Sequence, residues 1–364
     1  MKSIGVSVLA LTLWTSSAMA QTPAPPAAAP SMEIGGLVDV YYDFYSTKPT
    51  GDAQYRNFDT KHNQFAMSMA QVWLAKAPTE SSRVGFKFKL NFGAASSNFI
   101  HAVEPGGSPY QNIQEAYISY LAPAGKGLSL DAGVFVTPAG AEVIESKDNA
   151  NYSRGLLFAL AIPYYHSGVR MSYAANDKVT VMAGLVNGWN NIVENNTGKS
   201  VIGAVTIKPT SSVSVIAQYI GGPEKAGTND GMRHLFDGIV SASVSPKVTL
   251  TANYDLGTEK FGSSSVKWHG IAGYAKIQAT PTVAFTPRFE FFHDQDGFAT
   301  GVEQKLKELT GTLELKAADN LLWRIEFRRD FSDKDVFMND KGVAKGFQQS
   351  IGFGLMYSFA GKIQ

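Results

Sequence analysis

Apolar and polar side chains alternate at every second position over most of the chain, and this period constrains the fold more than any other feature. One segment alternates apolar Val84, Phe86, Phe88, Leu90 and Phe92 with Arg83, Lys87, Lys89 and Asn91. A second alternates Leu321, Trp323, Ile325 and Phe327 with Arg324, Glu326 and Arg328. Successive side chains of a strand point to opposite faces, so each segment predicts a strand with one apolar and one polar face.

Short and long connections separate these segments in turn. Short turn signals lie at residues 78–82, 122–127, 176–177, 209–212, 245–247, 280–282 and 318–320. Longer polar stretches lie at about residues 46–61, 94–110, 137–161, 190–199, 221–232, 257–265, 294–304 and 332–346. Seven turns and eight loops predict sixteen strands, an even number that can close as an antiparallel ring.

We therefore predict an all-β fold, a transmembrane antiparallel β-barrel of about 16 strands with short periplasmic turns and long extracellular loops. Strands of about nine to thirteen residues cross a bilayer core when they are tilted. Hydrocarbon offers no hydrogen-bond partner, so every strand edge must be paired. A ring of this size can enclose water. A soluble β-sandwich is the alternative, although it would not need every second connection to be long.

Aromatic residues near the expected strand ends fit the interfacial girdles of such a barrel. They are Tyr41, Tyr42, Phe44, Tyr120, Tyr164, Tyr165, Trp189, Trp268, Trp323, Tyr357 and Phe359.

The composition agrees with an exported β protein. Only 17% of the 364 residues are charged, against about 25% in soluble domains, and there is no cysteine that could form a disulfide. The formal net charge is +1, so no strong field attracts nucleic acid, and we expect no nucleic-acid partner.

The N-terminus reads as a targeting segment. Residues 1–20 combine a basic start, a short apolar core and an Ala18-Met19-Ala20 end, which predicts a cleaved secretory signal peptide. An uncleaved anchor is the alternative, but the apolar core is too short to span a bilayer. Residues 21–32, rich in proline and alanine, are expected to form a periplasmic tether, and residues 33–364 a single barrel domain.

The stretch 137–161 stands out among the long loops because apolar residues such as Val143, Ile144 and Leu156 lie among its charges. A loop surrounded by water would not need them, so we expect it to fold into the barrel and narrow the lumen. A lid packed over the outer mouth is an equal alternative. The proposed constriction residues are Glu142, Glu145, Lys147, Asp148 and Arg154.

Charges on the polar faces of the strands are expected to line the pore. The proposed wall residues are Lys87, Lys89, Glu115, Asp131, Arg170, Arg288, Glu290, Arg324, Glu326 and Arg328. Opposed charges across a narrow opening favour hydrated solutes, and their mixed signs predict weak ion selectivity. The expected function is passive diffusion of small hydrophilic solutes.

Four runs of the chain resemble the beta-barrel porin-2 (OmpL-like) family of bacterial outer-membrane porins. They are residues 112–123, residues 137–149 with Tyr152-Ser153-Arg154, residues 162–168, and residues 184–191. The resemblance implies an outer-membrane channel in a Gram-negative bacterium. The position of the third loop also resembles the inward-folded loop of general sixteen-stranded porins, and by the same analogy a homotrimer is expected.

The last strand, Gly354-x-x-Tyr357-x-Phe359, resembles the C-terminal signal by which barrel proteins are recognised for insertion. It implies the barrel assembly machinery and outer-membrane lipid as partners. Five residues, Ala360–Gln364, follow Phe359, where such chains commonly end.

Two other functions stay open. An outer-membrane barrel can be a phospholipase-like enzyme, but the only adjacent His/Ser pair, His166-Ser167, would point to opposite faces of a strand. A closed structural or adhesive surface barrel is the second. The stretch Asp294-Gln295-Asp296-Gly297 partly resembles a calcium loop, but its flanks read as strands and favour a surface turn. We expect no cofactor, no metal and no catalytic residues.

Overall fold

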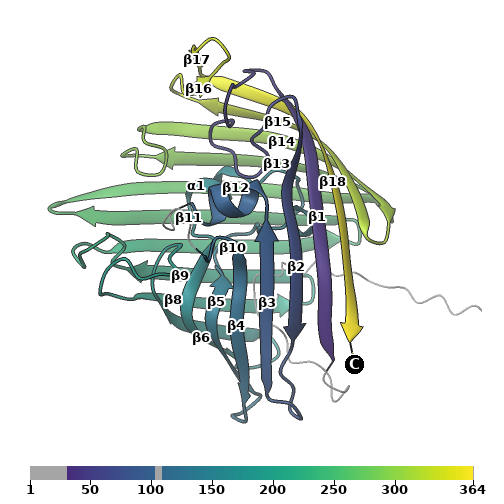
Figure 1. Ribbon diagram of the computed structural model, residues 1–364, viewed down its shortest axis with the longest axis vertical. Coiled ribbons are helices and arrows are strands. Elements are labelled where there is room, and N and C mark those ends of the chain that lie inside the picture. Colours follow the sequence, from purple (N-terminus) through teal and green to yellow (C-terminus); the bar gives the residue numbers. More distant parts are fainter. Residues whose placement is uncertain (1–30, 103–108, 364) are drawn as a thin grey trace, which may run out of the picture.

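A computed structural model describes residues 31–102 and 109–363, and within them the chain forms one closed barrel. The barrel strands are β1 (Met32–Tyr45), β2 (Phe65–Lys76), β3 (Val84–Phe92), β4 (Ile113–Ala122), β5 (Leu128–Val136), β6 (Tyr165–Ala174), β7 (Val179–Val186), β8 (Ser200–Thr210), β9 (Val213–Gly222), β10 (Arg233–Ser245), β11 (Val248–Phe261), β12 (Ser264–Thr280), β13 (Val283–Asp294), β14 (Gln304–Ala318), β15 (Leu321–Ser332) and β18 (Phe347–Ile363). Strand β18 pairs antiparallel with both β1 and β15, which closes the ring (Figure 1).

The remaining elements lie in the long connections. They are the π-helix η1 (Ala95–Ile100), the 3-10 helix η2 (Ser146–Asp148), the helix α1 (Leu156–Leu160) and a small hairpin of β16 (Phe337–Met338) and β17 (Ala344–Lys345). In the described part of the chain, no helix is both long and apolar enough to cross a bilayer.

The sixteen-strand antiparallel barrel confirms the fold predicted from the alternation. All seven predicted turns join the expected strands, and β8 to β9, for example, are separated only by residues 211–212. The predicted signal peptide, residues 1–20, and most of the predicted tether lie outside the described residues and stay predictions. Met32, which we assigned to the tether, already belongs to β1.

One predicted long loop, residues 257–265, is wrong. Strand β11 continues to Phe261 and β12 begins at Ser264, so a two-residue turn joins them. Gly262 supplies the left-handed backbone that such a turn requires (φ 57°). The residues that looked like a loop are the polar face of a strand, since Glu259 forms an ion pair with Arg233 of the neighbouring strand β10 at 2.5 Å.

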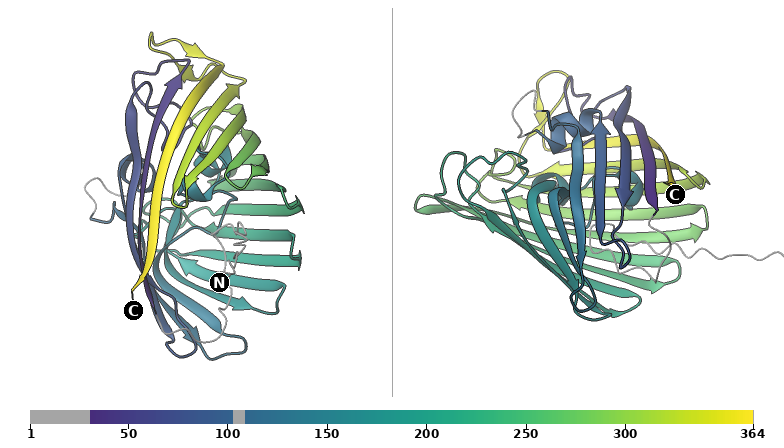
Figure 2. Two further views of the ribbon diagram at one scale, coloured as in Figure 1. Left: turned by 90° about the vertical axis from the view of Figure 1, so that its right-hand side faces the viewer. Right: turned by 60° about the horizontal axis from the view of Figure 1, so that its bottom comes forward.

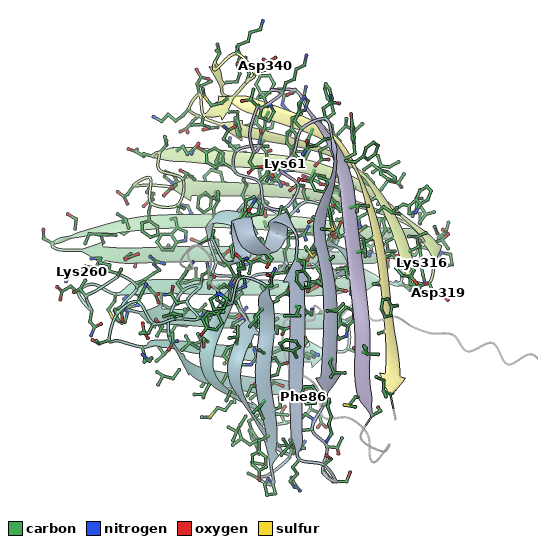
Figure 3. All side chains as sticks on the ribbon, in the orientation of Figure 1. Lys61, Phe86, Lys260, Lys316, Asp319 and Asp340 are labelled. Carbon is green, nitrogen blue, oxygen red and sulfur yellow. The ribbon has the colours of Figure 1, made fainter. Side chains whose placement is uncertain are left out.

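Exposure is inverted relative to a soluble protein. On β15, Ile325 and Phe327 are 44% and 47% exposed, whereas Arg324 and Arg328, on either side of this pair, are fully buried. Exposed apolar side chains cover the outside of the other strands too, as the side chains of Figure 3 show around the barrel. A soluble sandwich would bury this apolar face, so the exterior is suited to hydrocarbon.

The aromatic residues divide between the two faces. Phe44, Trp323 and Tyr357 are exposed on the outside, as expected for a girdle, whereas Tyr41 and Trp268 point inward and are buried. The inward pair belongs to a core that the barrel shares with its connecting loops. The prediction of a girdle position is therefore wrong for Tyr41 and Trp268.

Candidate functional site

The connection between β5 and β6, residues 137–164, lies against inward-facing side chains of the barrel, and we name it the inner loop. The indole Nε1 of Trp268 on β12 donates to Ala161 O at 3.1 Å, and Asn253 on β11 accepts from Ala141 N at 2.9 Å. Figures 1 and 2 show α1, which is part of this loop, within the ring of strands. The loop therefore occupies part of the lumen.

Arg324 on β15 binds the backbone of the inner loop. One guanidinium nitrogen, Nη1, donates to the carbonyls of Ser146 at 2.5 Å and Asn151 at 2.8 Å, and Nη2 donates to the carbonyl of Asn149 at 2.6 Å. The side chain is fully buried and forms an ion pair with Glu314 of β14. A buried loop needs partners for its carbonyls, and one arginine supplies three of them.

Arg288 on β13 binds the next part of the loop. It donates to Glu142 Oε1 at 2.7 Å and to the carbonyl of Ser153 at 2.6 Å, and it forms an ion pair with Glu308 at 2.7 Å. Its fork of donors thus bridges a loop carboxylate, a loop carbonyl and a wall carboxylate.

Arg328, near Arg288 on the barrel wall, completes this row of guanidinium groups. It donates to the carbonyl of Arg154 at 2.6 Å and forms ion pairs with Glu308 at 2.8 Å and Asp330 at 2.7 Å. Each wall arginine therefore contacts the loop and a wall carboxylate, so its buried charge is compensated.

Wall carboxylates bind the N–H groups of the same loop. Glu326 accepts from Tyr152 N at 2.7 Å and Ser153 N at 3.0 Å, and Glu290 accepts from Leu156 N at the start of α1. The loop backbone thus receives both donors and acceptors from β13 to β15. This satisfies peptide groups that have no sheet partner.

Strands β2 to β4 also hold the loop, through Glu145. Its Oε1 accepts from Lys89 Nζ of β3 at 2.7 Å, Gln114 of β4 at 2.7 Å and Gln71 of β2 at 3.0 Å. Burial works to raise the pKa of the Glu145 carboxyl, but the Lys89 ammonium and the amide donors outweigh it and hold this pKa well below its usual range. The carboxylate therefore stays charged at neutral pH.

Strand β1 adds a contact between these two walls. Asp39 accepts from the hydroxyls of Ser146 at 2.5 Å and Tyr152 at 2.8 Å. The middle of the inner loop is consequently fixed to β1 to β4 on one side and to β13 to β15 on the other.

The five proposed constriction residues divide into two groups. The buried Glu142, Glu145 and Arg154 hold the loop in place. Arg154 donates to the carbonyls of Ile144 and Tyr152, within the loop itself. Lys147 and Asp148 keep 23% and 34% of their side chains exposed and form an ion pair at 2.8 Å. Only these two present substantial charged surface to open space.

The ten proposed wall residues divide in the same way. Partly exposed side chains belong to Lys87, Lys89, Asp131 and Arg170, and those of Glu115, Arg288, Glu290, Arg324, Glu326 and Arg328 are buried. Lys87 pairs with Glu115 at 2.7 Å and Arg170 with Asp131 at 3.0 Å. All of them face inward as the alternation predicts, but the charges on β13 and β15 lie beneath the inner loop.

A second loop, residues 46–64, contributes buried residues that the sequence analysis did not single out. Arg56 forms ion pairs with Asp59 at 2.9 Å and with Asp330 of β15 at 3.1 Å. Phe58 lies edge-on to Phe158 of α1, with ring centroids 5.9 Å apart. The signal that could have indicated this packing is the presence of Tyr55 and Phe58 in an otherwise polar loop.

The residues considered for other chemistry have structural roles. His166 interacts through its two ring nitrogens with Gly188 O at 2.9 Å and Thr137 Oγ1 at 3.2 Å, not with Ser167. Asp294 accepts the backbone N–H groups of Phe298, Ala299 and Thr300 and so closes a turn. Across residues 31–102 and 109–363, no group of three His, Asp or Glu side chains is arranged to hold a metal ion.

Solved structures with the same fold include an outer-membrane protein, a porin and a channel. The chain resembles OmpT of Vibrio cholerae in its trimer form, with 12% identity, 91% of this chain and 100% of that chain covered, and a TM-score of 0.61. An anion-selective porin from Comamonas acidovorans has 10% identity, covers the same shares of both chains and gives a TM-score of 0.61. The outer-membrane channel DcaP of Acinetobacter baumannii has 12% identity, with 93% and 100% covered and a TM-score of 0.59.

At these identities the likeness establishes the fold, and no curated protein matches the sequence. The family described as "Putative beta-barrel porin-2, OmpL-like" matches residues 31–359, which is nearly the whole described chain. The chain belongs to this family of outer-membrane β-barrel porins.

Proposed function

We propose that this porin is a passive diffusion channel for small hydrophilic solutes and that the inner loop forms its constriction. The observation that carries the proposal is the arrangement of charge: an apolar exterior surrounds an interior into which every Asp and Glu of the barrel strands points. Such an interior favours water and polar solutes. The neighbouring porin folds support the same role.

The open part of the lumen would lie between the inner loop and β5 to β9. The loop's middle is bonded to β1 to β4 and to β13 to β15, which leaves Lys147 and Asp148 as its exposed charges. On the wall, Asp131 and Arg170 are the partly exposed pair. Both pairs combine one positive and one negative charge, so we infer weak selectivity between cations and anions.

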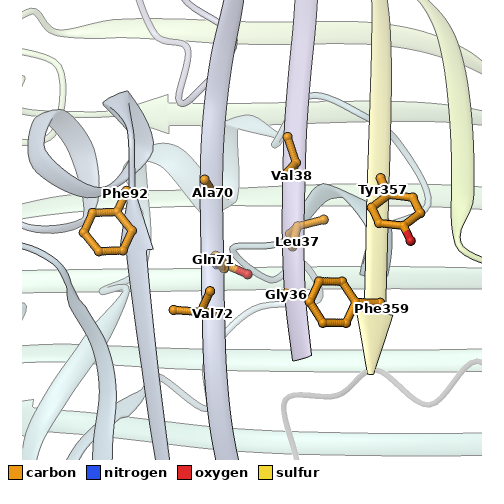
Figure 4. Close-up of a pocket in the computed structure, with 9 residues that line it drawn as sticks. All are labelled: Gly36, Leu37, Val38, Ala70, Gln71, Val72, Phe92, Tyr357 and Phe359. Carbon is orange, nitrogen blue, oxygen red and sulfur yellow. The ribbon is translucent and has the colours of Figure 1, made fainter. Parts of the chain in front are cut away.

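We also propose a homotrimer held by the exterior of β1, β2 and β18. A groove on this face is lined by apolar and small residues, including Gly36, Ala70, Val72, Tyr357 and Phe359 (Figure 4). At the positions of β1, β2 and β18 whose side chains point out of the barrel, the only charged residue is Lys76, at the short-turn end. A neighbouring fold, OmpT, has been obtained as a trimer.

Liposome swelling tests the channel role. Vesicles that contain the purified full-length protein should swell in solutions of small sugars, at rates that fall as sugar size increases, because a water-filled bore excludes large solutes. Vesicles with heat-denatured protein are the control. Absence of swelling for every sugar would instead favour a closed structural barrel.

Removal of residues 141–151 tests the constriction. The deletion takes away the part of the loop that crosses the lumen, so single-channel conductance in planar bilayers should rise. Shortening the loop of residues 332–346 by a similar length is the matched control, since it should leave conductance unchanged. Equal conductance of the folded 141–151 deletion and the parent chain would remove this loop from the constriction.

Substitution Arg324→Gln tests how the loop is held. The shorter amide cannot reach three carbonyls and leaves Glu314 without its strongest partner, so unfolding free energy in vesicles should fall by about 3–5 kcal/mol. Open-channel current noise should rise as the loop loosens. Arg170→Gln removes a guanidinium without loop contacts and should increase the noise far less. Quiet currents and unchanged stability for Arg324→Gln would contradict the anchoring role.

The trimer is tested by native mass spectrometry of the detergent-solubilised protein, where the mass of three chains is expected. Val72→Arg places a charge on the exposed groove and should yield monomers. The equivalent change Val205→Arg, on the exterior of β8, should leave the trimer intact. A monomeric parent protein would overturn this assignment.

A further inference from the structure

The exterior of the barrel carries charge of one sign, mostly at one end. The positions of the sixteen strands whose side chains point out of the barrel hold no Asp or Glu. They hold six cations: Lys76, Lys260, Lys267, Lys305, Lys307 and Arg329. All except Lys76 lie on β11 to β15, at the end of the barrel that carries the long loops, although β11 and β12 themselves meet there in the two-residue turn. Figure 3 places Lys260 at this end, opposite Lys316 and Asp319 at a short turn.

Four of these cations, Lys267, Lys305, Lys307 and Arg329, form what we name the outer basic patch. They lie on β12, β14 and β15 of the four neighbouring strands β12 to β15. Strands are about 4.8 Å apart, so the patch extends over about 15 Å of the barrel wall. It is therefore wide enough to bind more than one anionic group.

The strand register makes this patch continuous. Lys305 lies directly opposite His293, and Lys307 lies between Phe291 of β13 and Phe331 of β15. His293 is in turn opposite His269, with ring centroids 5.4 Å apart. The two imidazoles thus fill the outer surface between Lys267 and Lys305 with further groups that can donate hydrogen bonds.

The charges of the patch are not neutralised by the protein. Among the described residues none of its four side chains forms an ion pair with a carboxylate, in contrast to the wall arginines of the interior. Two loop carboxylates, Asp296 and Asp333, accept the backbone N–H groups of Lys267 and Lys305. Those bonds leave both ammonium groups available to an external anion.

Arg329 is held in position for such an anion. Its guanidinium carbon lies 4.6 Å from the centroid of Phe331 and 4.5 Å from that of Phe347, both on the outer surface. Its Nε is buried without a hydrogen-bond partner, whereas the side chain as a whole is partly exposed. An arginine fixed between two rings is suited to bind a phosphate oxygen through its terminal guanidinium nitrogens.

We propose that the outer basic patch binds the phosphates of a lipid headgroup in the membrane leaflet at the long-loop end. A charge facing hydrocarbon is costly at mid-membrane and is tolerated at the interface, which is where these residues lie. Exposed apolar residues of this part of the wall, such as Leu309 on β14 and Phe289 on β13, continue below the patch and fit the acyl chains. Anionic headgroups attract clustered lysine and arginine residues.

The proposal depends on insertion of the barrel in a membrane but not on its channel activity. The test compares binding of diphosphoryl lipid A, and of the same lipid without phosphates, to the full-length protein in neutral detergent. The variant carries Lys305→Gln, Lys307→Gln and Arg329→Gln. The matched control carries Lys76→Gln, Lys208→Gln and Lys316→Gln, which lie toward the short-turn end.

Three lost contacts should weaken binding of the diphosphoryl lipid on the order of 100-fold, whereas the control should bind like the parent chain. The dephosphorylated lipid should bind weakly to all three proteins. Equal affinity of patch variant and parent, an equal loss in the control, or tight binding of the dephosphorylated lipid would each overturn the assignment.

Heat-modifiable migration in gels shows whether each barrel is folded. If the triple variant does not fold, Lys307→Gln alone replaces it, because Lys307 is exposed and makes no ion pair; unchanged affinity would then overturn the proposal. Sugar-driven swelling of vesicles is measured in parallel. A variant that loses lipid binding and keeps swelling separates failure of the lipid site from failure of the channel.

Discussion

Hydrocarbon cannot hydrogen-bond a peptide group, and the architecture of this chain follows from that constraint. Each of the sixteen strands must pair along both of its edges, and the pairing of β18 with β1 provides partners for the last two open edges. Once the ring is closed, the two-residue period of a strand divides the side chains between two different surroundings. Ile325 faces outward and Arg324 and Glu326 face inward, so charges that could not remain in lipid are collected inside. The closed backbone therefore explains the charged interior.

That interior explains how a loop can be buried. The inner loop has no sheet neighbour for much of its backbone, and a buried peptide group without a partner is costly. Arg324 supplies donors to three of its carbonyls, and Glu326 accepts two of its N–H groups. Neighbouring wall charges, such as Glu314 beside Arg324, compensate the charges that the loop covers. Several residues predicted to line the pore wall serve instead as a framework for the segment proposed to narrow the lumen.

The sequence predicted the features that depend on short-range periodicity. The strands and the inward direction of residues such as Lys89 and Arg288 follow from the alternation, and the seven turns follow from the local turn signals. The prediction failed at residues 257–265, because the inward polar residues Gly257 and Glu259 look like a loop when their neighbouring strand is unknown. It also could not show that Arg324 lies beneath the inner loop, or that Arg56 pairs with Asp330, which is 274 positions away. Such contacts depend on strand register and loop direction across the barrel, which a single sequence does not specify.

The anchoring contacts separate the position of the inner loop from much of its chemistry. Arg324 and Arg328 bind backbone carbonyls, which every residue type provides. Lys147 and Asp148, in contrast, have partly exposed side chains that form no hydrogen bond or ion pair with these arginines. Charges at the exposed positions can therefore change while the bonds that fix the loop remain. Glu142 and Glu145 are different, because each uses its carboxylate to bind a wall cation. Variation that alters solute preference should accordingly be tolerated at Lys147 and Asp148 and resisted at the two glutamates.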